Sequence, residues 1–130
     1  MRSIKYILIN DTLPQSNSGV SDNCCISNLG HHFIINSQGM LLRPIDIHQP
    51  GAFMPKPLAG QEDLNKCSIG IKYNGKLSDR QLRPLLISLL LDLRDQFPNA
   101  KILAKDEYDR WHIHVRDDIN QLRRELSDYP

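Results

Sequence analysis

The chain has 130 residues, 40% of them hydrophobic, and its 16 basic residues nearly balance 15 acidic ones. This length and apolar content suit a single domain, residues 1–130, with a core of its own. The balanced charge provides no strong field to attract nucleic acid, so we expect no nucleic-acid partner.

The N-terminal part has the pattern of short strands separated by loops. Residues 4–9 are apolar and rich in β-branched side chains, which predicts a buried first strand. The stretch 11–28 is rich in Ser, Asn and Gly and has no helical period, so we expect a loop. Residues 32–36 and 40–42 flank a Ser-Gln-Gly turn and predict a hairpin.

A long segment of another composition separates this hairpin from the next strand. Residues 46–65 begin with prolines and glycines and continue with charged side chains, which predicts a long surface excursion. Residues 68–73 are again apolar and predict a strand that ends at the turn Asn74-Gly75.

One amphipathic helix stands out in the C-terminal part. Leucines recur on one face from residue 82 to residue 93, and Ser78 with Gln81 has the spacing of a capping box. Pro84 lacks a backbone donor, so we expect a bend or a helix start later than this cap.

The last elements complete a pattern of alternating strands and helices. Residues 101–104 and 111–115 have strand patterns, and Asp117 or Asp118 precedes a short helix that ends near Leu126. Together the elements predict an α/β domain in which a central mixed β-sheet is flanked by helices.

No segment has the pattern of membrane insertion or export. The longest apolar run, residues 85–91, is too short to span a bilayer, and the apolar stretch near the N-terminus is too short for a secretory signal. We expect no membrane partner and a cytoplasmic location, or a periplasmic or extracellular one if a leader was removed or cell lysis releases the protein. Cys24, Cys25 and Cys67 lack C-x-x-C spacing, so we expect ordinary thiols.

Three motifs occur in the order and spacing of a known family. They are Gly-His-His-Phe-Ile-Ile at residues 30–35, Ser-Ile-Gly-Ile at 68–71 and Phe-Pro-Asn-Ala-Lys-Ile at 97–102. With Arg43-Pro44 and the Leu-rich helix, they resemble the type 2 N-acetylmuramoyl-L-alanine amidases, a family that includes phage lysozyme-type amidases and peptidoglycan recognition proteins. The resemblance covers nearly the whole chain and implies an amidase type 2-like fold and a peptidoglycan ligand.

The resemblance also implies a catalytic zinc, but this chain has other residues at the ligand positions. Asn10 stands where the first zinc-binding His is expected, Lys105 stands at the second, and ungapped counting places Ile113 at the third. A neutral amide is a poor zinc ligand, an ammonium has no lone pair, and a hydrocarbon offers no donor atom. We therefore expect no metal or other cofactor.

The positions that the resemblance assigns to catalysis are changed as well. His31 replaces the family's catalytic Tyr, and Trp111 falls near its oxyanion-stabilising Lys. We therefore expect a non-catalytic, amidase-like domain that binds peptidoglycan fragments. The expected ligand-binding residues are Arg43, Asn65, Asn10 and Lys105, the last supplying a positive charge where the cation once sat.

Two alternatives remain open. In the first, His31, His112 and His114 converge on a relocated zinc site and restore an active amidase of peptidoglycan catabolism. Against it, His31 and His32 are neighbours on a predicted strand and so face opposite sides, which favours packed or surface histidines. In the second, a regulatory or interaction protein binds a protein partner through the Leu-rich surface or the excursion. The excursion could instead cover the cleft, although a plain solvent loop is the commoner outcome for such a segment.

Overall fold

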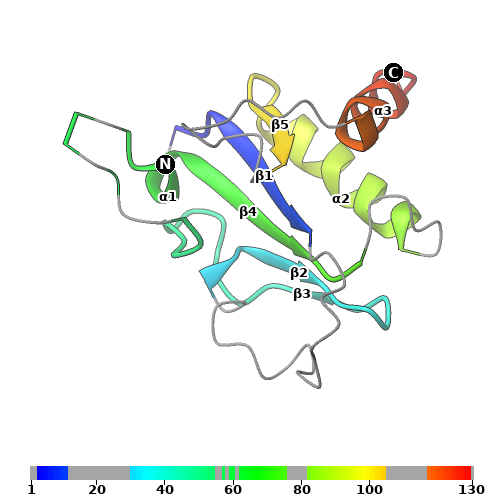
Figure 1. Cartoon of the computed structure of the whole chain (residues 1–130), viewed down its shortest axis with the longest axis horizontal. Helices are drawn as coiled ribbons and strands as arrows, with labels where there is room; N and C mark the ends of the chain where they lie inside the picture. The colour runs from blue at the N-terminus through cyan, green and yellow to red at the C-terminus, as the bar shows by residue number, and fades with distance from the viewer. Residues whose placement is uncertain are drawn as a thin grey trace.

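A computed structural model describes residues 3–11, 30–54, 57, 59–60, 62–75, 82–104 and 117–129 of the chain. The described residues form a five-stranded sheet with helices packed on it (Figure 1). The strands are β1 (Tyr6–Asp11), β2 (Phe33–Ile35), β3 (Leu41–Leu42), β4 (Ser68–Tyr73) and β5 (Lys101–Ala104), and the helices are α1 (Leu64–Cys67), α2 (Arg83–Gln96) and α3 (Asp117–Ser127).

The sheet is mixed, with strand order β3-β2-β4-β1-β5. β1 pairs in parallel with β4 on one side and with β5 on the other, so that Ile9 lies opposite both Ile71 and Ala104. β2 pairs in parallel with β4, and of the five described strands only β3 is antiparallel to its neighbour. The carboxyl ends of β1, β2, β4 and β5 therefore lie at the same edge of the sheet. The predicted mixed sheet with helices is confirmed.

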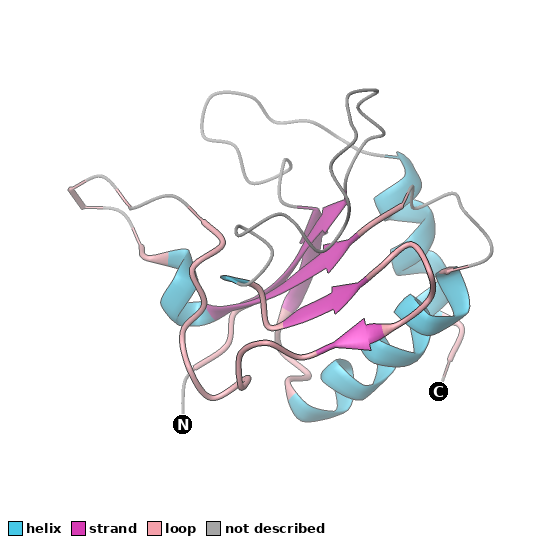
Figure 2. Cartoon of the chain, turned by 90° about the horizontal axis from the view of Figure 1, so that it is seen from below, coloured by secondary structure: helices cyan, strands magenta, loops and turns pink. Residues whose placement is uncertain are grey.

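One face of the sheet is covered by α2 and α3, as Figure 2 shows. Alternation along β1 places Ile7 and Ile9 on this face and Leu8 on the other. Leu90 of α2 and Leu122 of α3 pack into the same cluster as the two isoleucines and are fully buried. Burying such a side chain contributes about 1.5–3 kcal/mol, so this face holds the main core.

The long helix α2 begins at Arg83, with Pro84 in its first turn. A proline is tolerated there because the N–H groups of the first turn have no acceptor within the helix. The predicted late start is thus confirmed, whereas Ser78 and Gln81 lie outside the described residues. Among the described helices, none is long and apolar enough to cross a membrane.

The bounds of the other strands and helices agree to different degrees with those predicted from the sequence. The hairpin, the strands at 68–73 and 101–104 and the last helix are confirmed. β1 lies two residues later than predicted, because Asn10 and Asp11 still pair with β4. Apart from Asp11, the expected loop at 11–28 lies outside the described residues, as does the expected strand at 111–115.

Candidate functional site

The face of the sheet opposite α2 and α3 is covered by residues 49–54, which we call the strap, and by α1. Leu8 of β1 packs there against Phe53 and Leu64 in a second, smaller apolar cluster. Phe53 is only 7% exposed, although most of the other described residues of the excursion are exposed, as its composition predicted. An isolated aromatic among prolines and glycines has no periodicity that would have indicated its burial. We call this side of the sheet the strap face.

Asn65, the second residue of α1, holds the strap in place. Its Oδ1 accepts hydrogen bonds from the backbone N–H groups of Phe53 and Met54, both at 3.0 Å, and its Nδ2 donates to the carbonyl oxygen of Met54, also at 3.0 Å. Asp63, the N-cap of α1, accepts from the backbone N–H of Asn65 and fixes its position. Asn65 thus has a clear structural role, and its role in ligand binding stays a prediction.

His32 joins the strap to the centre of the sheet. Its Nδ1 accepts the backbone N–H of Gly70 at 3.1 Å, and its Nε2 lies 2.7 Å from the carbonyl oxygen of Gln49. Since an acceptor at Nδ1 carries no proton, Nε2 is the donor and the ring is the neutral Nε2–H tautomer. The side chain is fully buried, and its two hydrogen bonds connect β4 with the strap.

His31 lies beside His32 on the same side of the sheet. The ring of Phe53 stacks on His31 with centroids 5.4 Å apart and meets His32 edge-on at 5.9 Å. The prediction that the two histidines face opposite sides is therefore wrong. The reason is local: β2 begins at Phe33, so both residues precede the strand and do not follow its alternation.

Two glycines make room for the strap. A Cβ atom on Gly70 would lie 2.7 Å from the ring of Phe53, and one on Gly30 would lie 2.2 Å from the carbonyl oxygen of Ala52. Gly70 is the only residue without a side chain in β4, and a glycine inside a strand often marks the close approach of another group. This was the one sequence signal that could have indicated the close packing of Phe53 on β4.

Asn10 and His31, which the resemblance assigns to a zinc ligand and to the catalytic Tyr, are neighbours. The side-chain amide nitrogen of Asn10 lies 3.4 Å from Nε2 of His31. Asn10 follows Leu8 by two residues, so it lies on the strap face and is half-buried. A neutral carboxamide directed at an imidazole does not fit a zinc ligand. Within the described ranges, no three His, Cys, Asp or Glu residues are grouped so that they could hold a metal ion.

The remaining candidate residues are not brought to this place. Arg43 is exposed and lies with its guanidinium carbon 5.8 Å from the ring centroid of Phe33, which packs in the core on the helix-covered side. Arg43 therefore does not join Asn10 and His31. Five other candidates lie outside the described residues: Lys105, Trp111, His112, Ile113 and His114.

The cysteine predictions can be compared with the structure at one position. Cys67 is a buried free thiol, as expected, and its burial raises its pKa above the usual value. The raised pKa disfavours the reactive thiolate, which agrees with an ordinary packed cysteine. Cys24 and Cys25 lie outside the described residues.

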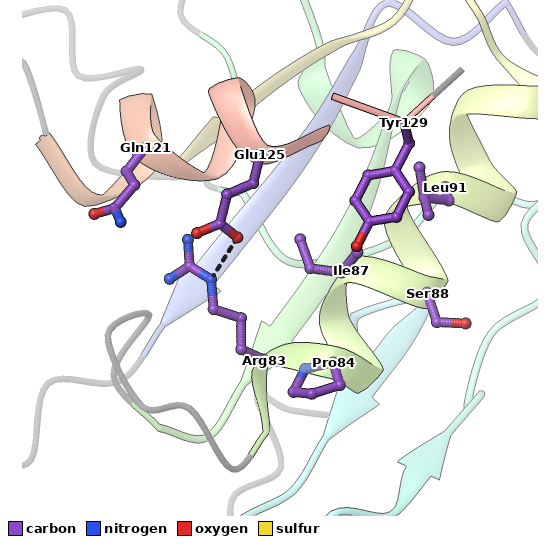
Figure 3. A pocket seen from close by; sticks show the side chains of 8 residues that line it. All are labelled: Arg83, Pro84, Ile87, Ser88, Leu91, Gln121, Glu125 and Tyr129. Atoms are coloured by element: carbon purple, nitrogen blue, oxygen red, sulfur yellow. Dashed lines mark hydrogen bonds and ion pairs between the residues drawn. The ribbon is translucent and has the colours of Figure 1, made fainter. Parts of the chain in front are cut away.

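A groove of about 680 Å³ is lined by residues of α2, of α3 and of the chain that follows α3 (Figure 3). Ile87, Leu91 and Tyr129 line it together with one ion pair, in which Nε of Arg83 lies 3.1 Å from Oε2 of Glu125. The two opposite charges face each other, so the groove presents no single sign of charge to a ligand. The predicted protein partner at the Leu-rich helix stays a prediction.

Comparisons with known proteins leave the family open. No protein-family model matches the chain, and neither a curated protein nor a solved structure matches it. The amidase resemblance therefore depends on the motifs quoted above and on the positions that those residues occupy.

Proposed function

We propose that this chain is a non-catalytic relative of the type 2 N-acetylmuramoyl-L-alanine amidases that binds peptidoglycan fragments. The order and spacing of its motifs support the amidase-like form of the fold, and a mixed sheet with a long helix behind it is compatible with that form. Fold alone does not determine function, so the proposal depends on the residues at the site.

The contact between Asn10 and His31 is the observation that carries the proposal. Two positions that are 21 residues apart in sequence, and that the resemblance assigns to one catalytic centre, lie side by side. Both side chains carry hydrogen-bonding groups: half-buried Asn10 can reach the amide and hydroxyl groups of a muropeptide, whereas His31 can do so only when Phe53 no longer covers it. Neither generates hydroxide at neutral pH as a zinc ion does, so we expect binding without cleavage.

The two alternatives have unequal support. A zinc site built from His31, His112 and His114 requires access to His31, which is 2% exposed and covered by Phe53. Binding of a protein partner has a physical location, the groove between α2 and α3, but no charge or contact there indicates a particular partner. We therefore rank binding of fragments first.

Calorimetric titration with muramyl dipeptide, which contains the bond that the family cleaves, tests the proposal. We expect wild-type protein to bind the dipeptide and leave it intact in mass spectrometry, and Asn10→Ala to weaken binding about tenfold or more, the loss of one to two hydrogen bonds. Ser88→Ala, on the exposed side of α2, is the matched control and should bind as wild type does.

Two results would reject the proposal. Cleavage of the dipeptide that stops when a chelator is added, together with zinc in the purified protein, would make the chain an active hydrolase. The absence of any binding by wild type, with Asn10→Ala and Ser88→Ala behaving alike, would remove the fragment as a ligand.

A further inference from the structure

Phe53 fills a recess on the strap face whose walls come from three separate segments. Gly70 of β4 forms the floor, His31 stacks on the ring with an interplanar angle of 26°, and His32 meets its edge. The recess fits an aromatic ring closely, because even a methyl group added at Gly70 would overlap with it.

The strap is fixed to the protein on both sides of this ring. Before Phe53, the carbonyl of Gln49 accepts from His32, and the N–H of Ala52 donates to the carbonyl of Gly30 at 2.9 Å. At Phe53 and after it, Asn65 binds the backbone through three hydrogen bonds. The ring is thus held over His31 by the chain itself, and its removal requires several of these bonds to break together.

We propose that Phe53 is an autoinhibitory group that occupies the place of a bound ligand's apolar part over His31. The identity of the ligand rests on the proposed function, whereas the shielding of His31 does not. A ligand that needs His31 binds only when the strap is raised, so its measured affinity is lowered by the fraction of molecules that are open. Wild-type protein would then bind a fragment through Asn10 with only part of the available affinity.

Shielding can be measured without any ligand by modification with diethyl pyrocarbonate, which acylates accessible imidazoles. His48 is exposed in the same excursion and serves as the internal reference. Each histidine is mapped by mass spectrometry, and its rate is divided by its own rate in the urea-unfolded chain. We expect His31 to react about tenfold or more slowly than His48 in wild type, and to react within about threefold of His48 in Phe53→Ala.

A second variant keeps the test valid if Phe53→Ala does not fold. Gly70→Ala keeps the phenyl group but places a methyl group in the recess, so it should displace the ring and also accelerate modification of His31. Ser88→Ala, exposed on α2 on the other side of the sheet, is the control and should leave the rate of His31 unchanged. Circular dichroism identifies the variants that fold.

The outcomes separate this inference from the proposed function. The shielding is overturned if His31 reacts as fast as His48 in wild type. It is also overturned if His31 stays protected in every folded variant that removes or displaces the ring. If His31 becomes accessible and muramyl dipeptide then binds about tenfold or more tightly, the autoinhibitory role is supported. An affinity that stays equal or falls overturns that role. If no variant binds the dipeptide although His31 opens, the shielding holds and the proposed function fails.

Discussion

The two faces of the sheet are stabilised in different ways. The helix-covered face is a continuous layer of Ile and Leu side chains from β1, β4, α2 and α3, and every member of the cluster is apolar apart from the hydroxyl of Tyr73. The strap face has a small apolar cluster, and directed hydrogen bonds of His32 and Asn65 hold the strap over it. Burial of apolar side chains is non-directional and stabilises the whole domain, whereas hydrogen bonds are directional and hold the strap in one position. We therefore expect the strap face to open more readily than the helix-covered face.

The largest loss of stability is expected from a substitution on the helix-covered face. Leu90→Ala removes a fully buried side chain and should lower the free energy of unfolding by about 2–5 kcal/mol, because a cavity remains after the lost burial. Urea unfolding measures it. Ser88→Ala, exposed on the same helix, should change the stability by less than about 0.5 kcal/mol. A loss at Leu90 no greater than that of the control would mean that this face is not the main core.

The next largest loss of stability is expected from a substitution that loosens the strap alone. Asn65→Ala leaves the N–H groups of Phe53 and Met54 without their acceptor, at a cost of about 2–3 kcal/mol unless water enters. Asn65→Asp keeps the acceptor but cannot donate to Met54, so it should cost less. Hydrogen exchange should become faster in the strap and stay unchanged in α2. Equal acceleration in α2 would break the comparison between the two faces.

A double-mutant cycle tests the packing of the ring against the sheet. Gly70→Ala should destabilise the protein by about 1–3 kcal/mol because the new methyl group overlaps with Phe53. In the Phe53→Ala background the same change should cost almost nothing, since the overlap is gone. Urea unfolding of the four proteins gives the coupling energy. Additive costs would show that the ring does not lie over Gly70.

The smallest effect is expected in the groove between the helices. Glu125→Gln removes the charge that faces Arg83, and the loss should be below about 1 kcal/mol because Glu125 is 39% exposed and water screens the pair. Thermal unfolding at low and high salt measures it, and salt should reduce the difference between wild type and variant. A loss that exceeds this limit and does not depend on salt would show that the ion pair takes part in the core.

The predictable part of the fold follows from periodicity. The strand at 68–73 and the long helix were predicted because their apolar side chains repeat at periods of two and of three to four residues. The start of α2 was predictable from Pro84, whose missing N–H restricts it to the first turn. Each of these signals depends only on residues that are close together in the sequence, so it can be recognised without knowledge of the tertiary structure.

The strap face was less predictable because its contacts join distant residues. Asn65 holds a backbone segment 11 and 12 positions earlier in the chain, and Gly70 accommodates a ring 17 positions earlier. The resemblance assigns Asn10 and His31 to one catalytic centre, and their side chains lie 3.4 Å apart, whereas the alternation expected at His31 is wrong because β2 begins only at Phe33. Periodicity carries no information on such pairs, and residues that precede a strand do not follow its alternation of side chains.

The position of β1 between β4 and β5 has a consequence for synthesis on the ribosome. The Ile-Leu-Ile stretch of this strand emerges long before either neighbour, since its pairing partners begin at Ser68 and at Lys101. Until then the nascent chain exposes an aggregation-prone apolar segment, and parallel pairing of strands so far apart in the sequence forms slowly. Chains that stall before residue 101 should therefore be clients of chaperones and proteases, and folding is completed only once translation has passed β5.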